Sequence, residues 1–454
     1  MTDSNENNGG MNRRQFVEKS TLLAGGAVLA TSLAGCATSG APAASVAYAG
    51  GSDTLKLAVV GCGGRGTGAA TQALKADTGI ELVAVADAFD DRAEKCVRTL
   101  KKIYGDQRVK VTPETTFTGF QAFQQAIDLA DVVILTTPPG FRPEHFEYAV
   151  AQNKHIFMEK PVATDAYGIR RVLAAARDAQ EKKLNVVVGL QRRYQPSYLE
   201  TYQRFQAGAV GEILSGQVYW NSGGVWVRPR EAGQTEMEYQ MRNWYYFNWL
   251  CGDHILEQHI HNIDVANWFI GDYPVSAQGM GGRQVRNGKD HGEIFDHHFV
   301  EFTYASGAVI SSQCRHQPGC ANMVEERFQT TAGSIYTSGS NEGILTSRSQ
   351  GQLYKHSGMF DPSPYQTEHD KLFASIRSGG VINNADYGAR STMTAIMGRM
   401  ATYSGQRIEW DEALASKRRL MPESKDLRWD SKPPTLPDTE GNYPIPEPGK
   451  TRVL

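Results

Sequence analysis

The chain has 454 residues, 40% of them hydrophobic and 21% charged, and a formal net charge of −2. This composition is typical of a soluble globular protein that is long enough for two domains with separate cores. The near balance of charge, with no basic run and no interleaving of aromatic and basic residues, argues against a nucleic-acid partner.

The first 36 residues have the features of an export signal. Arg13 and Arg14 precede a mildly apolar stretch at 21–33, and this arrangement resembles a twin-arginine signal peptide. The stretch is shorter than the ~20 apolar residues that a membrane span needs. We therefore expect the protein to leave the cytoplasm by the twin-arginine route and to be periplasmic or anchored to the membrane.

Residues 33–36, Leu-Ala-Gly-Cys, resemble a lipobox. Cleavage there would leave Cys36 as a lipid-modified N-terminus, and the lipid would be the protein's contact with the membrane. Cleavage after Ala49, as in an ordinary signal peptide, is the alternative. Residues 37–53 consist mainly of small residues and are predicted to form a flexible tether.

Residues 54–185 are predicted to form a Rossmann-type NAD-binding domain. An apolar run at 57–60, as expected of a strand buried on both faces, leads into the sequence GCGGRG. In this G-x-G-x-x-G spacing the first glycine permits a tight turn, the second lets a pyrophosphate approach the backbone, and the third lets helix and strand pack closely. The residues of this loop that we expect to bind the cofactor are Gly61, Gly63, Gly64, Arg65 and Gly66.

The next predicted strand, at 81–89, contains Asp87 about 20 residues beyond the glycines, where this fold places a ribose-binding acid. A carboxylate there accepts hydrogen bonds from a ribose hydroxyl and repels a 2′-phosphate, so we expect NAD rather than NADP. Further strands at 131–139 and 155–161 flank a helix at 142–152, and this alternation predicts a doubly wound parallel sheet. Both strands end in the segments TTPP and MEKP, at the edge where such sheets bind ligands.

Several motifs, taken in chain order, resemble those of one oxidoreductase family. They are GCGGRG, the acid Asp87, TTPPGFRPEH ending at His145, MEKP at 158–161, VVVGLQRRYQP at 186–196 and EQHIHNIDVANWFIG at 257–271. Together they resemble the glucose–fructose oxidoreductase, inositol 2-dehydrogenase and rhizopine-catabolism family (Gfo/Idh/MocA), from Leu55 to Glu409. The resemblance implies a homo-oligomeric oxidoreductase with a small carbohydrate substrate. The further cofactor-binding residues that it implies are Thr137, Pro138, His145, Glu159 and Lys160.

The same resemblance implies how the substrate is held. In the family, the lysine of Glu-Lys-Pro and a downstream histidine frame the substrate hydroxyl beside the nicotinamide, and here these are Lys160 and His261. A neutral histidine can remove the hydroxyl proton, and a lysine ammonium can stabilise the developing alkoxide. The family often has aspartate four residues before the histidine, whereas this chain has Glu257, which we expect to orient the imidazole or the substrate. Arg193 and Asp264 match further family positions and are expected to contact the substrate.

Helical periodicity across 251–269 predicts one helix with His254, Glu257, His261 and Asp264 on a single face. This face either holds a metal ion through the first three of these side chains or lines a sugar-binding cleft without metal. The family resemblance favours the cleft. We therefore expect no metal, and we expect His254 to contact the substrate.

Residues 219–250 are dense in Trp, Tyr and Arg. Aromatic faces stack on the C–H surfaces of sugars while polar groups bond the hydroxyls, so this stretch is predicted to be a substrate-facing loop that includes Trp244 and Tyr245. The alternative is an oligomer contact, because the same residue types dominate protein interfaces.

Strand patterns separated by glycine turns at 276–338 predict a large, mainly antiparallel open sheet within an α+β domain at 186–430. A helical stripe of methionine and isoleucine at 393–400 is expected to be core, with Gly405 ending that helix. The proline-rich tail at 431–454 is expected to be extended and without fixed secondary structure.

These features together predict an exported oxidoreductase that acts on a hydroxyl of a sugar or glycoside by reversible hydride transfer. The twin-arginine route carries folded proteins, so NAD can be bound before export. Because no soluble pool would regenerate the cofactor outside the cytoplasm, we expect it to be tightly bound and recycled within each cycle. One alternative is an NAD-dependent glycoside hydrolase that works by oxidation, elimination, addition and reduction. A second is a non-catalytic, sugar-binding surface lipoprotein.

Overall fold

The computed structural model describes residues 54–454, and the predicted signal and tether at 1–53 lie outside the described residues. Within 54–454, the structure contains no helix that is both long and apolar enough to cross a membrane.

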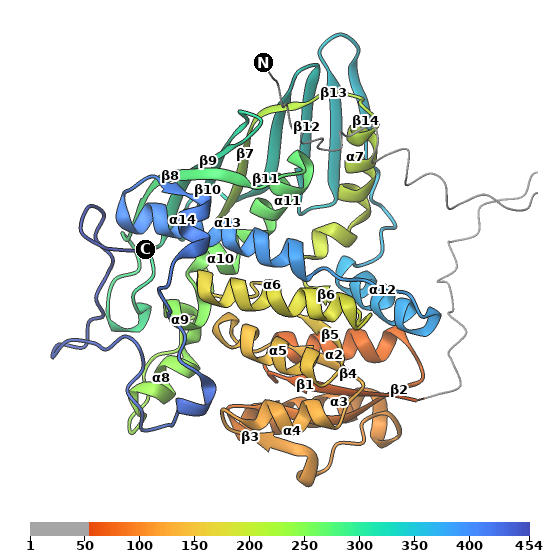
Figure 1. Ribbon diagram of the computed structural model, residues 1–454, viewed down its shortest axis with the longest axis vertical. Coiled ribbons are helices and arrows are strands. Elements are labelled where there is room, and N and C mark those ends of the chain that lie inside the picture. Colours follow the sequence, from red (N-terminus) through yellow and green to blue (C-terminus); the bar gives the residue numbers. More distant parts are fainter. Residues whose placement is uncertain (1–53) are drawn as a thin grey trace, which may run out of the picture. The chain divides into compact units, whose positions relative to one another are not determined.

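A parallel sheet of six strands forms the first half of the described chain (Figure 1). Its order is β3-β2-β1-β4-β5-β6, and the strand order reverses between β1 and β4, which makes the carboxyl end of β1 the point where such sheets bind ligands. The strands are β1 (Leu55–Val60), β2 (Ile80–Asp87), β3 (Thr116–Thr118), β4 (Val132–Leu135), β5 (His155–Met158) and β6 (Val186–Val188). The predicted doubly wound Rossmann-type sheet is confirmed; β6 lies just past the boundary expected at residue 185.

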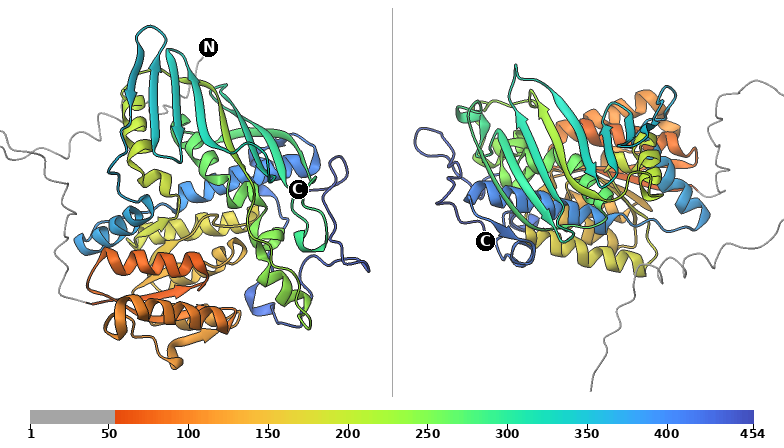
Figure 2. Two further views of the ribbon diagram at one scale, coloured as in Figure 1. Left: turned by 180° about the vertical axis from the view of Figure 1, so that it is seen from behind. Right: turned by 90° about the horizontal axis from the view of Figure 1, so that it is seen from above.

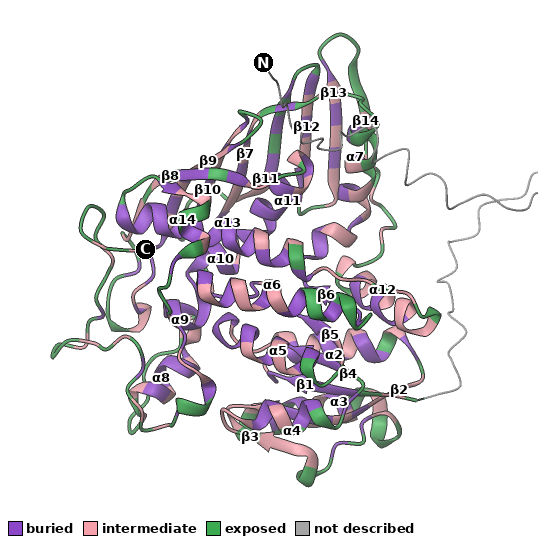
Figure 3. Cartoon of the chain, in the orientation of Figure 1, coloured by how far each residue is buried: buried purple, intermediate pink, exposed green. Residues whose placement is uncertain are grey.

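The continuous apolar run of β1 is explained by helices on both faces of the sheet. Leu57 and Val59 pack with α2, α3 and α12 on one face, whereas Ala58 and Val60 pack with α4, α5 and α6 on the other. The buried interior of these strands is visible in Figure 3. The helices are α2 (Gly64–Ala76), α3 (Asp90–Arg108), α4 (Ala122–Asp128), α5 (Arg142–Ala151), α6 (Ala166–Glu181) and α12 (Pro364–Ser378). Although α12 comes late in the chain, it returns to pack on α2.

A sheet of nine strands forms the second half, in the order β14-β13-β12-β11-β7-β10-β9-β8-β15 (Figure 2). Neighbouring strands are antiparallel except β7 and β10, which are parallel, so the predicted mainly antiparallel sheet is confirmed. The strands are β7 (Ile213–Ser222), β8 (Pro274–Gly282), β9 (His297–Tyr304), β10 (Val309–His316), β11 (Met323–Thr330), β12 (Gly333–Ser338), β13 (Glu342–Ser347), β14 (Gly351–Lys355) and β15 (Ile408–Glu409).

Helix α13 (Ala385–Ser404) connects the two halves, because it packs against α6 on one side and against β8 and β9 on the other. Its predicted apolar stripe is confirmed as core: Met393, Ile396 and Met397 are fully buried, and Gly405 ends the helix with a φ of 70°. Helices α7 (Pro196–Gln206) and α11 (Ile260–Ile270) also pack on the second sheet.

Short elements complete the described chain, and several of them position the site. They are η1 (Pro113–Thr115), η2 (Pro139–Phe141), η3 (Gln191–Tyr194), α8 (Glu236–Arg242), η4 (Trp244–Tyr246), α9 (Asn248–Cys251), α10 (His254–Glu257), η5 (Lys289–His291), α14 (Trp410–Ala415) and η6 (Ser424–Asp426). Residues 427–454, all of them described, contain no helix or strand, and the dark blue tail of Figure 1 runs beside α8 and α9.

Candidate active site

Two adjoining cavities lie at the carboxyl ends of β1, β2, β4 and β5. The first has a volume of about 410 Å³ and extends over the glycine loop to the end of β2. The second has a volume of about 320 Å³ and lies over the end of β5 and the start of α11. The residues that line both cavities are Arg65, Thr136, Thr137, Trp226 and Trp244. A ligand that filled the first cavity would therefore reach the second.

The glycine loop lines the first cavity, and its glycines serve two purposes. A Cβ on Gly66 would lie 1.9 Å from the carbonyl oxygen of Gly61, and Gly61 itself has a φ of 97°. The fold itself therefore requires these two glycines. By contrast, a Cβ on Gly64 would meet nothing within 4 Å, and one on Gly63 would meet only the Arg92 guanidinium at 3.8 Å. This open cradle beside the start of α2 fits a pyrophosphate.

Asp87 ends β2 at the far side of the same cavity. Its carboxylate accepts hydrogen bonds from the backbone N–H groups of Cys62, at 2.6 Å, and Phe89, at 3.0 Å. Burial raises the pKa of this carboxyl, while the two N–H groups oppose the shift. Thus the backbone fixes the carboxylate at the position where an acid in this fold meets a ribose.

His145 also lines the first cavity, on α5. Its Nδ1 lies 3.2 Å from the Thr137 hydroxyl, while its Nε2 is buried and has no hydrogen-bond partner among the residues described. Burial, together with the Arg142 charge, lowers the pKa of His145 to about 3. The imidazole is therefore neutral near pH 7, and one buried ring nitrogen remains available to a ligand.

Most of the predicted cofactor-binding residues line the first cavity, but Glu159 and Lys160 line the second. The Glu159 carboxylate forms an ion pair with Arg65 and accepts the backbone N–H of Lys160 at 3.2 Å. Arg65 also pairs with Glu368 of α12 at 3.1 Å. Arg65 and Glu159 thus join the glycine loop to the end of β5, where Lys160 is placed.

The three predicted catalytic side chains, Lys160, Glu257 and His261, all line the second cavity. The Lys160 ammonium donates to the Glu257 carboxylate at 3.2 Å and also to its main-chain oxygen. Burial raises the pKa of Glu257, and the Lys160 charge opposes that shift. Burial, followed by the Lys160 charge, lowers the pKa of His261 well below its ordinary value, so this imidazole is neutral. Its Nδ1 has no hydrogen-bond partner within the described chain.

Aromatic side chains wall the second cavity. Trp244 and Tyr245, the two predicted substrate contacts of η4, both line it, and the Tyr245 hydroxyl is buried without a partner among residues 54–454. Trp220 of β7 also lines it, with its ring centroid 5.9 Å from that of His261. The cavity thus combines flat apolar walls with unpaired polar atoms, which is the chemistry that a polyhydroxylated ring needs.

Residues 55–189 match the family model described as "Oxidoreductase family, NAD-binding Rossmann fold", and residues 198–335 match the "GFO/IDH/MocA C-terminal domain". The chain belongs to the Gfo/Idh/MocA oxidoreductase family. It is therefore an enzyme of an NAD-dependent class, and the first cavity lies over the glycine loop of the matched NAD-binding domain.

Curated relatives of this Gfo/Idh/MocA protein include inositol dehydrogenases. It is 27% identical to inositol 2-dehydrogenase of Cereibacter sphaeroides (strain ATCC 17029 / ATH 2.4.9) over 267 residues, which cover 58% of this chain and 69% of the relative. It is 24% identical to scyllo-inositol 2-dehydrogenase (NAD(+)) of Bacillus subtilis (strain 168) over 284 residues, which cover 62% and 73%.

Solved structures share its fold. Levoglucosan dehydrogenase in complex with NADH and levoglucosan superposes with a TM-score of 0.63 at 16% identity, covering 79% of this chain and 99% of that one. Aldose–aldose oxidoreductase from Caulobacter crescentus, complexed with glycerol, gives a TM-score of 0.60 at 17% identity, covering 78% and 99%.

In this family member the helix predicted across 251–269 is broken into α10 and α11. Asp253 caps α10 with a φ of 76°, and a turn at 258–259 separates α10 from α11, which begins at Ile260. His259, between the two helices, is buried and its Nε2 lies 2.7 Å from the Ser312 hydroxyl. Of the four side chains predicted to share one face, Glu257 and His261 line the second cavity, whereas His254 and Asp264 do not.

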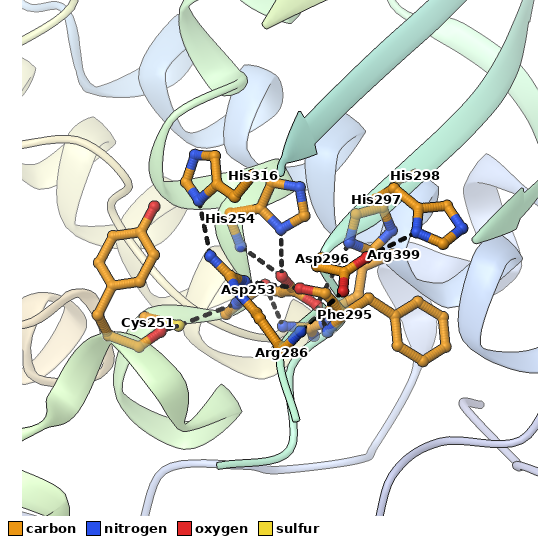
Figure 4. A network of polar contacts seen from close by, with 12 residues as sticks. Cys251, Asp253, His254, Arg286, Phe295, Asp296, His297, His298, His316 and Arg399 are labelled. Carbon is orange, nitrogen blue, oxygen red and sulfur yellow. Dashed lines mark hydrogen bonds and ion pairs between the residues drawn. The ribbon is translucent and has the colours of Figure 1, made fainter. Parts of the chain in front are cut away.

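His254 lies in a buried polar cluster instead of the cleft, which corrects its predicted contact with the substrate (Figure 4). Its Nδ1 lies 2.8 Å from the Asp253 carboxylate, which also has His298 Nε2 at 3.3 Å. These three side chains have potential ligand atoms within 4.8 Å of one another. Nevertheless, the two carboxylate oxygens already accept the backbone N–H groups of His254 and Phe295 and the hydroxyl of Tyr403. The cluster is therefore organised as a hydrogen-bonded support behind the cavity.

Arg193 and Asp264 bind each other, which corrects their predicted role as substrate contacts. The guanidinium donates two hydrogen bonds to the carboxylate, at 2.8 and 2.9 Å, and lies 3.9 Å from the centre of the Tyr387 ring. Asp264 also accepts from the Ser391 hydroxyl at 2.8 Å. Since neither residue lines either cavity, the pair fastens η3 to α11 and α13.

Sequence reasoning missed several residues that line the second cavity. Gln191, two positions before Arg193 in the same motif, lines it, and its Oε1 is buried without a partner in the described residues. Tyr365 of α12 accepts a hydrogen bond from the Gln191 amide at 3.2 Å. The family motif contained Gln191 and could have identified it, whereas no local pattern marked Tyr365. Arg142 also lines it and was missed, whereas Trp220 and Trp226 lie within the stretch at 219–250 that was predicted to face the substrate.

Proposed function

We propose that this protein is an exported, NAD(H)-containing oxidoreductase that transfers a hydride reversibly at a hydroxyl-bearing carbon of a sugar or glycoside. The observation that carries the proposal is the position of Lys160, Glu257 and His261, which line the second cavity where it adjoins the dinucleotide site. A substrate hydroxyl placed among them would have a neutral imidazole and an ammonium group within one small cavity.

When bound, NAD supplies the hydride acceptor for this chemistry. The chain's own residues handle the proton. The neutral His261 imidazole can take the hydroxyl proton, and the Lys160 ammonium can stabilise negative charge on the oxygen. Glu257 holds that ammonium in place through the 3.2 Å hydrogen bond. An unpaired charge is costly in a buried cavity, so the Lys160 ammonium needs a partner there, and the Glu257 carboxylate provides it.

Four aromatic side chains support a carbohydrate as the substrate. Trp220, Trp226, Trp244 and Tyr245 line the second cavity. Indole and phenol rings stack on the C–H faces of sugar rings, while Gln191 Oε1 and the Tyr245 hydroxyl are free to bond substrate hydroxyls. The named relatives and structural neighbours, which are dehydrogenases of inositol and of levoglucosan, support the same class.

Export and cofactor recycling form the second part of the proposal. The paired Arg13 and Arg14 and the segment ending at Cys36 support twin-arginine export and a lipid anchor. An exported enzyme would lack a soluble pool of NAD, so each cycle would return the hydride to a second substrate or to the oxidised product itself. We also propose that the protein forms a homo-oligomer, and this part of the proposal rests on the family resemblance alone.

The deciding experiment uses the protein purified without added cofactor. We expect denaturation to release NAD or NADH, and we expect suitable sugars to change the absorbance of the bound nicotinamide in a single turnover. A second sugar or the keto product should reverse that change. Bound cofactor that responds to no sugar, together with sugar binding in calorimetry, would instead support the non-catalytic lipoprotein.

A second candidate function is an NAD-dependent glycoside hydrolase. The second cavity offers Glu257 and the Tyr245 hydroxyl in addition to Lys160 and His261. These extra groups could remove the proton next to a newly formed ketone and assist loss of the glycosidic group, which simple oxidation does not require. Chromogenic glycosides offered without added cofactor test this candidate. Failure to release the chromophore while single-turnover reduction proceeds would exclude it.

A further inference from the structure

A segment of the second half of the chain forms part of the wall of the dinucleotide site. Residues 223–250, here named the crossing segment, follow β7 and contain α8, η4 and most of α9. They line the first cavity opposite the glycine loop with the side chains of Trp226, Arg228, Met241 and Trp244. The dinucleotide cavity therefore lies between the first sheet and the crossing segment.

One side chain fastens the crossing segment to the first half of the chain. Arg242, at the end of α8, pairs with the Asp91 carboxylate at 2.8 Å. Its guanidinium also lies 3.7 Å from the centre of the Phe89 ring. Since Phe89 lines the first cavity and lies two residues after Asp87, this fastening point is at the adenosine end of the site.

A second fastening comes from the C-terminal strap, defined as residues 416–454. The Trp429 ring lies 5.0 Å from Phe89 and 4.6 Å from Phe120, measured between ring centroids. Both phenylalanines line the first cavity. Trp429 therefore packs behind the wall that an adenine ring would contact, and the strap lies beyond the residues that the family models match.

Hydrogen bonds hold the strap both to α5 and to the crossing segment. The Ser424 backbone and hydroxyl donate to the Glu144 carboxylate at 3.0 and 2.7 Å, which ties the strap to α5. The Thr235 hydroxyl donates to the main-chain oxygen of Trp429 at 2.6 Å, which ties the crossing segment to the strap. Gln240 of α8 adds a donation to the Thr435 carbonyl at 2.8 Å. Figure 1 shows this tail beside α8.

We propose that Trp429 and Arg242, which lie behind the wall of the dinucleotide site, retain the cofactor by holding the crossing segment and the aromatic wall of Phe89 and Phe120 in place at its adenosine end. Exchange of the cofactor would require the crossing segment to separate from Asp91 and Phe89 and from the strap. This inference rests on the proposed function, because slow exchange matters for an enzyme that works away from a pool of NAD.

The test measures how fast bound NADH leaves. The purified protein is loaded with NADH, excess NAD is added, and the loss of NADH fluorescence is followed for the parent, Trp429→Ala, Trp429→Phe and Trp410→Ala. Trp410 is a matched control, because it is also a partly buried tryptophan but stacks on Tyr273, 5.8 Å away, and lines neither cavity. Thermal unfolding is recorded for each protein.

We expect Trp429→Ala to speed NADH release about tenfold or more, since each of its two aromatic contacts contributes on the order of a few-fold. Trp429→Phe should recover most of the retention, and Trp410→Ala should release NADH at the parent rate even if it lowers the unfolding temperature. Equal release from Trp429→Ala and the parent would overturn the inference, as would a parent that exchanges NADH within seconds.

Arg242→Ala gives an independent second measurement, with Arg390→Ala as its control. Arg390 of α13 also pairs with an aspartate, Asp386 at 3.0 Å, and lies 5.6 Å from the centre of the Tyr273 ring, but it lines neither cavity. Faster release is expected only for Arg242→Ala; equal effects from both variants would count against the inference. The proposed function is judged separately, by the cofactor content and sugar response of the parent protein, so each proposal can fail without the other.

Discussion

Lys160 donates a hydrogen bond from its ammonium to the Glu257 carboxylate across 3.2 Å, and both side chains line the same cavity. The two residues come from the end of β5 and from α10, so the contact joins the two halves of the chain within the second cavity. Glu257 occupies a position at which the family often has aspartate.

The first prediction concerns this pair. Glu257→Gln keeps the shape but removes the charge that holds the Lys160 ammonium, so we expect the single-turnover rate of nicotinamide reduction to fall about 100-fold, in the range typical of a lost proton-transfer partner. The cofactor content should not change, because Glu257 does not line the first cavity. Glu257→Asp, which restores the charge, should recover part of the rate. A Gln variant with the parent rate would contradict the role given to Glu257.

The second prediction separates Gln191 from Arg193, two residues of one short motif. Gln191 offers an unpaired oxygen to the second cavity, so Gln191→Ala should raise KM about tenfold with a smaller change in kcat, as expected for one lost hydrogen bond to a substrate. Arg193→Lys loses the two-point hydrogen bond to Asp264 and should lower the unfolding temperature with KM unchanged. The reverse pattern in steady-state kinetics and calorimetry would restore Arg193 as the substrate contact.

The predicted site residues that line the two cavities have local patterns around them. The glycine loop, Asp87 and Lys160 each follow an apolar strand, so their position at the carboxyl edge of a parallel sheet follows from the alternation of strands and helices. Asp264 illustrates where this reasoning stops. Periodicity placed it on the same helix as His261, and both lie in α11, but its carboxylate accepts hydrogen bonds from Arg193 and Ser391 and does not line either cavity.

Other parts of the site depend on contacts between distant segments. Tyr365 and Glu368 of α12 reach Gln191 and Arg65, and Trp429 reaches Phe120 from the C-terminal strap. No spacing within a short window of sequence signals such contacts, because they arise only when the two halves of the chain pack together. The fold was therefore predictable from strand and helix patterns, while the contacts that α12 and the C-terminal strap make with the site were not.

The third prediction concerns cofactor choice. Asp87→Ser removes a carboxylate that the backbone N–H groups of Cys62 and Phe89 hold at the edge of the first cavity. We expect the affinity for NADH to fall about tenfold, as for a lost charged hydrogen bond, while the affinity for NADPH rises or is unchanged. Equilibrium binding followed by nicotinamide fluorescence measures both. Asp90→Ser, which alters an acid that lines neither cavity, is the control, and an undiminished preference for NADH in Asp87→Ser would contradict the role of Asp87.

The fourth prediction is a loss of stability in mild acid that depends on buried neutral histidines. Burial lowers the pKa of His254 from 6.5 to about 4, and the neighbouring Asp253 only partly opposes this shift. As the pH falls from about 6.5 to about 4, the unfolded chain therefore binds a proton at this position while the folded chain does not. Stability must then decrease through this window, by on the order of 1 kcal/mol per pH unit for each such histidine.

His254→Asn tests this directly, because the amide can still donate to Asp253 but cannot titrate. We expect the variant to be less stable at pH 7 and to lose less stability than the parent between pH 6.5 and pH 4, in urea titrations at several pH values. Asn267→Ala is the control: it removes buried hydrogen bonds to Ser391 and Thr394, at 3.3 and 3.1 Å, but no titratable group, so it should keep the parent's slope. If stability falls with pH equally in His254→Asn and the parent, His254 is not the source of the acid sensitivity. His145 would then be the next residue to substitute, because burial lowers its pKa to about 3.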